Sequence, residues 1–348
     1  MRAAVMSVVG LAALVAVGLI AILMQPSDTS PAPKVPIANA AYSLPSSNPT
    51  PVQATAPRAS LPAASESTGW IAPAALPASV AETPFADSPT CLRNSGVLGV
   101  SRTVEIDTTE GPGFGFDHFK EHDFLRPKEV VLTFDDGPWP RNTSAVLAAL
   151  RANCVKATFF PIGKHAMWHP EILKQVAQDG HTIGSHTWSH ADLSKKSSEE
   201  AKREIEMGAS AVHMAVAGRT ALFFRFPALR HPPEMVAYLG QRNVAIFSCD
   251  IDSFDFTMRK PEQVIRSVMN KLAKHGKGII LMHDFQRATA EALPELLHQL
   301  KANGYQIVHM VPKASLQTIT DYDELIAKEN KLPTMSTRPT SSVVRSIQ

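Results

Sequence analysis

Two adjacent carboxylates follow an apolar run near the middle of the chain. The run VVLTF, residues 130–134, leads directly into Asp135 and Asp136, and Gly137-Pro138 come next. Two neighbouring carboxylates raise each other's pKa unless a cation intervenes. A metal ion would bind one carboxylate and leave the other free to act as a base. The alternative is an Asp-Gly-Pro turn in which these side chains cap backbone N–H groups, and these residues alone do not separate the two interpretations.

A pair of histidines spaced four residues apart lies further along, in the segment SHTWSH, residues 185–190. His186 and His190 share one face if the segment turns helically, and imidazole is a preferred ligand of zinc and related metals. With Asp136 they would supply three ligands and leave a position open for water, which is typical of catalytic zinc sites. We interpret the histidines outside this setting as structural or surface residues: His165, His169, His181 and His231.

Three more polar segments follow apolar runs. The segment FRFP carries Arg225, which can hold a carboxylate bidentately and keep it ionised. The segment CDIDSFDF offers Asp250, Asp252 and Asp255, and LMHD carries His283, a side chain suited to proton donation. Each residue alone is an ordinary loop residue, so the prediction of a site depends on their convergence.

Short apolar runs alternate with helix-like stretches between residues 129 and 311, and several of these stretches begin with Pro. This alternation predicts an α/β fold with seven parallel strands, closed as a barrel or open and doubly wound, with the polar segments gathered at the carboxyl ends of the strands. The expected strands are 130–134, 157–162, 182–185, 222–226, 244–249, 279–282 and 306–310, and 98–108 adds a further one. The expected helices are 144–153, 170–179, 197–215, 233–242, 261–273 and 289–302.

Composition limits the remaining possibilities. The 348 residues carry a formal net charge of +2, which argues against a protein that holds nucleic acid by general electrostatics. The three cysteines allow at most one disulfide. In an exported protein Cys91 could pair with Cys154 or with Cys249, and three buried thiols are the alternative.

The first 90 residues divide into an apolar and a proline-rich segment. Residues 3–24 contain no charged side chain and are long enough to span a bilayer, with Arg2 on the cytoplasmic side. We therefore favour an uncleaved signal anchor, residues 1–25, over a cleaved signal peptide. Residues 26–90 hold 13 of the 27 prolines and predict a disordered linker. Both interpretations export the chain, which predicts a cell-envelope or periplasmic protein anchored in the inner membrane, or a secreted one after cleavage.

Five segments together resemble one known family. TFDDGP at 133–138, SHTWSH at 185–190, RFP at 225–227, DSFDF at 252–256 and LMH at 281–283 occur in the order and at the spacing of the NodB-homology polysaccharide deacetylases, carbohydrate esterase family four. The resemblance covers about residues 127–312, which would form the catalytic domain, with 91–126 as an N-terminal extension and 313–348 as a C-terminal tail. It implies a distorted (β/α) barrel with one divalent metal, usually zinc, that removes acetyl groups from N-acetylglucosamine polymers or acetylated xylan.

The resemblance also implies a role for each matched residue. Asp135 would be the general base, and the metal ligands would be Asp136, His186 and His190. Arg225 would steer Asp135, and Asp255 would orient His283 as the general acid. The substrate pocket would include Leu281, Phe256 and Pro227. This chain departs from the family pattern at two positions, because the glycine expected two residues after Pro227 is absent and Phe256 replaces a tryptophan.

The sequence thus predicts a metal-dependent N-deacetylase of chitooligosaccharides, peptidoglycan or an exopolysaccharide. Cobalt, nickel or manganese could replace zinc in such a site. The alternatives are an O-acetyl (xylan-type) esterase with the same mechanism, a catalytically silent carbohydrate-binding barrel, and an envelope scaffold for protein partners. The expected partners are an acetylated amino-sugar polymer and, through residues 3–24, the membrane.

Overall fold

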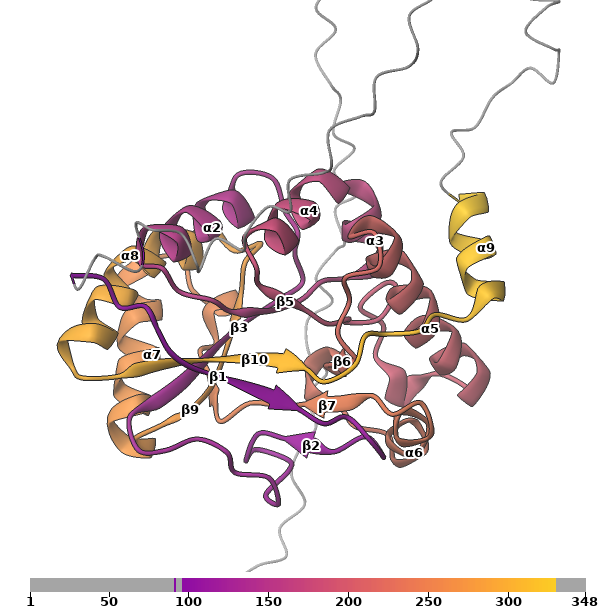
Figure 1. The fold of residues 1–348 in the computed structure, drawn as a ribbon, viewed down its shortest axis with the longest axis horizontal. Coiled ribbons are helices and arrows are strands. Elements are labelled where there is room, and N and C mark those ends of the chain that lie inside the picture. Colours follow the sequence, from indigo (N-terminus) through magenta and orange to yellow (C-terminus); the bar gives the residue numbers. More distant parts are fainter. Residues whose placement is uncertain (1–90, 92–95, 330–348) are drawn as a thin grey trace, which may run out of the picture. The chain divides into compact units, whose positions relative to one another are not determined.

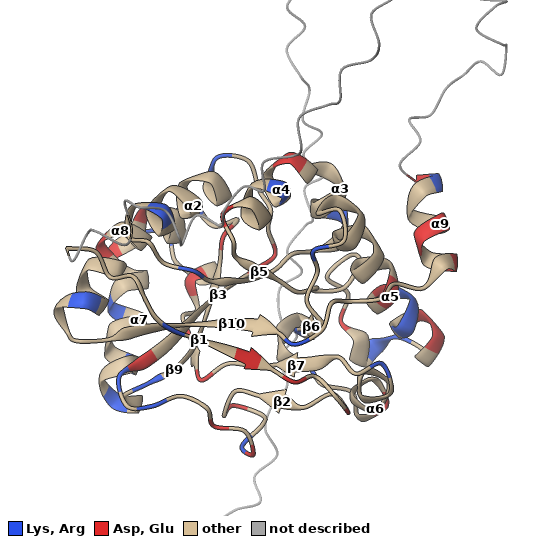
Figure 2. Cartoon of the chain, viewed as in Figure 1, with Lys and Arg blue, Asp and Glu red and all other residues tan. Residues whose placement is uncertain are grey.

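The structure is a computed structural model that describes residue 91 and residues 96–329 (Figure 1). The predicted anchor and linker lie outside the described residues, as does the end of the tail. None of the helices within the described ranges has the length and apolar character needed to cross a bilayer. The described part is an α/β fold with parallel sheets, as predicted. Acidic and basic residues both occur on its outer helices (Figure 2).

The strands form two parallel sheets, and the larger one contains β3, Glu129–Asp135, which pairs with three neighbours. The larger sheet adds β1 (Val100–Ile106), β4 (Thr158–Phe160), β5 (Thr182–Ile183), β8 (Ile251–Asp252), β9 (Gly278–His283) and β10 (Gln306–Pro312). The smaller sheet contains β2 (Gly113–Phe114), β6 (Phe223–Phe224) and β7 (Ala245–Phe247).

The strands from β3 to β9 are connected in a closed series that begins and ends at β3. Strand β3 pairs with β4, β4 with β5, and Ser185 just after β5 forms a parallel bridge to Phe224 in β6. Strand β6 pairs with β7, the chain continues from β7 into β8, and β8 pairs with β9, which pairs with β3. Strands β3 to β9 therefore form a ring.

The last expected strand does not belong to this ring. Strand β10 pairs with β3 only at Glu129 and Val130, because β4 takes Thr133–Asp135 further along the same strand. Its other neighbour is β1, which forms the alternating strand expected in the N-terminal extension.

The six expected helices are present, with ends that agree to within two residues. Pro occupies the first turn of three of them, and Ser197 with Glu200 forms a capping box at the start of α5. Two further helices, α3 and α9, were not expected. The helices are α2 (Asn142–Ala152), α3 (Gly163–Trp168), α4 (Pro170–Gln178), α5 (Ser198–Ala215), α6 (Pro233–Gln241), α7 (Pro261–His275), α8 (Arg287–Ala302) and α9 (Thr320–Glu329).

Alternation along β3 and β9 decides which side chains face the ring's interior. On β3, Val130, Leu132 and Phe134 belong to the core cluster shared with the outer helices, whereas Val131 belongs to the cluster inside the ring. Since successive side chains of a strand point to opposite faces, Asp135 shares the inner face with Val131. The same alternation on β9 places His283 on the inner face with Ile279, because Ile280 and Met282 pack outward. The two strands thus aim a carboxylate and an imidazole at one space.

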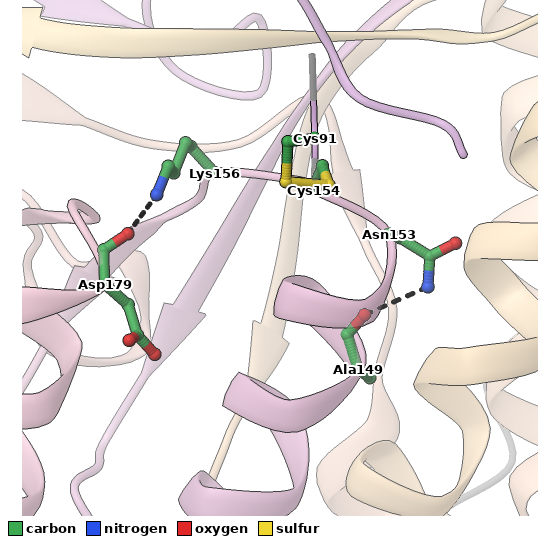
Figure 3. The surroundings of a disulfide bond; sticks show 6 residues. All are labelled: Cys91, Ala149, Asn153, Cys154, Lys156 and Asp179. Carbon is green, nitrogen blue, oxygen red and sulfur yellow. Dashed lines mark hydrogen bonds between the residues drawn. A yellow bond between two sulfur atoms is a disulfide. The ribbon is translucent and has the colours of Figure 1, made fainter. Parts of the chain in front are cut away.

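The segments that flank the ring are fastened to it. Cys91 forms a disulfide with Cys154, in the turn between α2 and β4, and this confirms a disulfide and identifies the partner (Figure 3). Cys249 is a buried free thiol. In the tail, α9 packs against α5, where Ile326 is buried in one cluster with Met207 and Ala211.

Candidate active site

A cavity of about 410 Å³ lies at the carboxyl ends of the ring strands. Its position is the one expected for an α/β sheet or barrel, because the loops that follow parallel strands meet there. The residues that line it are Asp135, Asp136, His186, His190, Phe226, Ala228, Leu229, Asp252, Phe254, Phe256, Leu281 and His283. The candidate base, acid and metal ligands predicted from the sequence therefore share one cavity.

Three of these side chains form a group with metal-ligand geometry. Oδ1 of Asp136 lies 3.4 Å from Nε2 of His186 and 3.4 Å from Nε2 of His190, and the three candidate ligand atoms all lie within 4.8 Å of one another. The same Oδ1 is buried and has no hydrogen-bond partner among the residues that the structure describes. Because buried polar atoms are almost always satisfied, this oxygen and two facing imidazole nitrogens fit a divalent cation.

The protonation of His186 suits a ligand. Its Nδ1 lies 2.7 Å from the carbonyl oxygen of Arg225 and donates to it, which leaves a lone pair on Nε2, facing Asp136. Burial lowers the pKa of His186 below its ordinary value, and the nearby Asp135 and Asp136 only partly oppose this shift. A neutral imidazole is the form that binds a metal.

The loops that carry the candidate ligands adopt backbone conformations that most residues avoid. Asp136, Thr187 and His190 have φ values of 72°, 63° and 59°. Thr187 Oγ1 accepts a hydrogen bond from the His190 N–H at 3.0 Å, and Gly163 N–H donates to the Thr187 carbonyl at 2.9 Å. Left-handed backbone persists at non-glycine residues only where the surroundings hold it, and such strain is concentrated at functional sites.

Arg225 is fully buried beneath the cavity and holds Asp135. Its Nη1 donates to Asp135 Oδ1 at 2.7 Å and to Thr133 Oγ1 at 2.7 Å, while its other nitrogens donate to the carbonyls of Phe247 and Ser248. The contact with the carboxylate is therefore single and not the bidentate pair that the sequence suggested, because backbone acceptors take the rest of the guanidinium. This leaves Asp135 Oδ2 available to the cavity, 4.0 Å from His186 Nε2.

His283, another residue that lines the cavity, forms a close pair with Asp255. Its Nδ1 lies 2.6 Å from Asp255 Oδ1, and Asp255 Oδ2 accepts hydrogen bonds from the His283 N–H and from Thr289 Oγ1. Burial opposes the charged imidazole, but the hydrogen bond and negative charge of Asp255 outweigh it and raise the pKa of His283 to about 9. His283 Nε2 lies 3.9 Å from Asp136 Oδ2, so a protonated nitrogen faces the cavity.

The apolar walls differ partly from those expected. Leu281 and Phe256 line the cavity, and the Phe256 ring lies edge-on to His283 with centroids 5.5 Å apart. Pro227 is buried and is not among the lining residues, whereas Ala228 and Leu229 are. Leu229, at the position of the missing family glycine, has a φ of 53°. Leu229 thus adopts a left-handed backbone, which glycine favours, and its side chain forms part of the wall.

Sequence reasoning missed Asp284, which supports the Asp136 loop. Its buried carboxylate accepts hydrogen bonds from the Gly137 N–H at 3.0 Å and from Thr143 Oγ1 at 2.6 Å. A Cβ on Gly137 would lie 2.1 Å from Asp284 Oδ2, so only glycine fits here. Burial raises the pKa of Asp284 to about 7. Its one sequence signal is its place directly after His283.

Comparison with known proteins shows consistent similarities. A sequence model described as polysaccharide deacetylase matches residues 124–246. A peptidoglycan-N-acetylglucosamine deacetylase of Listeria monocytogenes is 34% identical over 187 residues, which cover 52% of this chain and 38% of that protein. A Bacillus cereus protein of the same description is 34% identical over 186 residues, which cover 52% of this chain and 85% of that protein. A solved peptidoglycan deacetylase of Bdellovibrio bacteriovorus is 35% identical with a TM-score of 0.57, covering 64% of this chain and 61% of that chain.

Proposed function

Because the chain belongs to the polysaccharide deacetylase family, we propose that it is a metal-dependent hydrolase that removes N-acetyl groups from N-acetylglucosamine-containing poly- or oligosaccharides and releases acetate. The observation that carries this proposal is the buried, unpartnered Asp136 Oδ1 that faces two imidazole nitrogens. Beside it, one cavity holds a carboxylate fixed by Arg225 and an imidazole held by Asp255.

The proposed ligands are Asp136, His186 and His190. A cation bound to them would polarise the acetyl carbonyl and make the attacking water more acidic. Zinc is the first choice, because two histidines and one carboxylate with an open position suit it, and cobalt, nickel or manganese could take its place.

The chain's own residues would move the protons. Asp135, held by Arg225, accepts the proton of the attacking water through Oδ2. His283, kept protonated by Asp255, donates a proton from Nε2 to the departing sugar amine. No protein nucleophile is needed in this scheme, so no covalent intermediate forms on the chain.

The walls would select the acetyl group and its sugar. Leu281 packs against the acetyl methyl, and Phe256 offers an aromatic face beside His283. We assign Pro227 to the turn that brings Ala228 and Leu229 to the cavity. The wall therefore carries two aliphatic side chains after β6.

The same proposal extends to the rest of the chain. Residues 127–312 would form a distorted (β/α) barrel as the catalytic domain, 91–126 an extension, and 313–348 a tail. The named relatives act on peptidoglycan, which favours a cell-envelope substrate. Residues 1–25 would anchor the protein in the inner membrane and 26–90 would act as a linker. The Cys91–Cys154 disulfide supports an oxidising compartment.

Acetate release from a defined panel of glycans tests this function. Purified protein is incubated with peptidoglycan, chitohexaose and acetylated xylan, with chelator, without chelator, and with zinc restored after chelation. We expect acetate from the amino-sugar polymers, its loss with chelator and its return with zinc. Acetate from xylan alone would identify an O-acetyl esterase, and metal binding without acetate release would identify a silent carbohydrate-binding barrel.

A further inference from the structure

Two tryptophans are exposed next to the cavity without lining it. Trp139, 39% exposed, lies in the loop between β3 and α2, and Trp168, 59% exposed, is the last residue of α3. Both belong to segments that follow ring strands at their carboxyl ends, the loop after β3 for Trp139 and helix α3 after β4 for Trp168. Large apolar side chains exposed together on a surface usually mark a binding site.

Two histidines join these tryptophans into one surface. The Trp139 ring lies edge-on to His165 and His169, with centroid distances of 5.2 and 5.7 Å. The His165 ring also lies against Trp168, with centroids 5.2 Å apart. Trp139, His165, Trp168 and His169 therefore form a continuous set of rings, which we call the aromatic platform.

The aromatic platform is fixed to the metal-ligand loops by hydrogen bonds. His165 Nδ1 lies 2.6 Å from the carbonyl oxygen of Asp136. Just before and within α3, Ile162 N–H donates to the Gly137 carbonyl at 3.1 Å and Gly163 N–H to the Thr187 carbonyl at 2.9 Å. The rings thus lie on the rim beside Asp136 and are held in register with the candidate ligands.

We propose that the aromatic platform binds a pyranose ring of the glycan chain beyond the sugar whose acetyl group enters the cavity. The cavity volume of about 410 Å³ is at the lower end of the range for ligand pockets, so a polymer must leave it across the rim. A pyranose has an apolar C–H face that stacks on an indole ring, while its hydroxyls can bond imidazole nitrogens. This inference rests on the proposed function, because it names where the same substrate continues.

Two measurements with chitobiose and chitohexaose test the aromatic platform. In the first, kcat/KM is measured on both oligomers. We expect Trp168→Ala to raise KM for chitohexaose about tenfold, so that the preference for the longer oligomer falls. Trp139→Ala should act in the same direction, and Trp168→Phe, which keeps a ring, should retain most of the preference. Phe116→Ala is the matched control, because Phe116 is also an exposed aromatic residue, at 40%, but lies on the N-terminal extension. Its N–H donates to Asp250, which also accepts the N–H of Ile279 at the start of β9, so Phe116 lies near the end of that strand opposite His283.

The second measurement is independent of turnover. Calorimetry follows chitohexaose binding to full-length Asp135→Asn protein with and without Trp168→Ala, and we expect about tenfold weaker binding without the indole. Unchanged binding and an unchanged length preference would overturn the inference while leaving the deacetylase proposal standing. Equal losses on both oligomers would show that the rings support the ligand loops and do not bind sugar. If no glycan is deacetylated but binding still requires Trp168, the proposed function fails and the sugar site stands.

Discussion

The two ends of the ring strands both bury ionisable side chains, but they use them differently. At the carboxyl ends, Asp136 Oδ1 faces a cavity and has no hydrogen-bond partner within the described part of the chain. At the amino ends of β4 and β5, Lys156 donates to the Asp179 carbonyl (Figure 3). His181 Nδ1 accepts a hydrogen bond from the Ala157 N–H at 3.2 Å. His309 lies 3.0 Å from Thr182 Oγ1 at the same end.

The ionisable side chains at the two ends of the strands differ in the charge of their neighbours. The carboxyl-end groups pair with opposite charges, as in His283 with Asp255, and this raises the pKa of the imidazole. The amino-end imidazoles are buried beside a lysine, so burial and the neighbouring positive charge lower the pKa of His309 to about 4. The same residue type is therefore an acid at one end and a neutral packing group at the other.

Removing a candidate ligand should produce the largest effect. His186→Ala or His190→Ala removes one of three ligands, so acetate release should fall to background and the purified protein should lose its metal. Metal analysis and an acetate assay measure both results. His298→Ala, an exposed change on α8, is the control. A His190→Ala protein with full metal content and normal turnover would show that the ligand set is wrong.

Substitutions of the two adjacent carboxylates should have different effects on metal content and on acetate release. Asp135→Asn keeps all three candidate ligands, so metal should remain while acetate release falls roughly 10²–10⁴-fold, the usual range for loss of a general base. Asp136→Asn removes the anionic candidate ligand and should lower metal affinity. If Asp135→Asn loses metal and Asp136→Asn retains it, the two roles must be exchanged.

The pair at His283 should set the alkaline limit of activity. A general acid must be protonated, so activity should decline as the pH approaches the His283 pKa of about 9. Asp255→Asn removes the charge that holds the proton, and the alkaline limb should move down by about 1–2 pH units with metal content unchanged. A pH profile of kcat/KM measures the shift. A limb that stays in place would show that another group titrates there.

The buried histidines at the amino ends of the strands should make the folded protein less stable as the pH falls, whereas His283 should limit activity as the pH rises. Burial and Lys156 hold the pKa of His181 and of His309 below 6.5. Below pH 6.5 these two histidines are therefore protonated in the unfolded chain while they are still neutral in the folded protein. Stability should therefore be full above pH 6.5 and decrease as the pH falls, by about 1–3 kcal/mol between pH 6.5 and 5.5. Urea unfolding at the two pH values measures this difference, and His309→Gln should reduce it. Equal stabilities at both values would contradict neutral burial.

Most of the fold could be predicted because the sequence signals are local and strong. Apolar runs of four to six residues mark the ring strands, and Pro or a capping box marks the helix starts. Helix α3 was missed because it has six residues and its start is stabilised by distant carbonyls, those of Gly137, Thr187 and Trp188. Strand β10 was expected, but its position outside the ring was not. That position depends on which strand pairs with each part of β3, since β10 pairs with its start and β4 with its end.

The candidate site could be predicted as a set of residues but not as a geometry. The motifs named the groups that share the cavity, yet the single contact from Arg225 to Asp135 depends on backbone acceptors after β7. Asp284 and the aromatic platform were missed because their contacts join loops that are far apart in the sequence. The motif predicts only that the family glycine is absent at Leu229, and the left-handed backbone of this residue depends on the fold.

The Cys91–Cys154 disulfide determines how the folded part carries a mechanical load. Cys154 lies in the turn before β4, at the end of the strands opposite the cavity, and the Gly99 N–H bonds the Asn153 carbonyl beside it at 2.9 Å. Tension on the chain ahead of Cys91 therefore enters through a covalent bond at the base of β4 and bypasses the hydrogen bonds between β1 and β10. The candidate site lies at the other end of the strands, so the disulfide joins the chain ahead of Cys91 to the end of the sheet opposite the cavity.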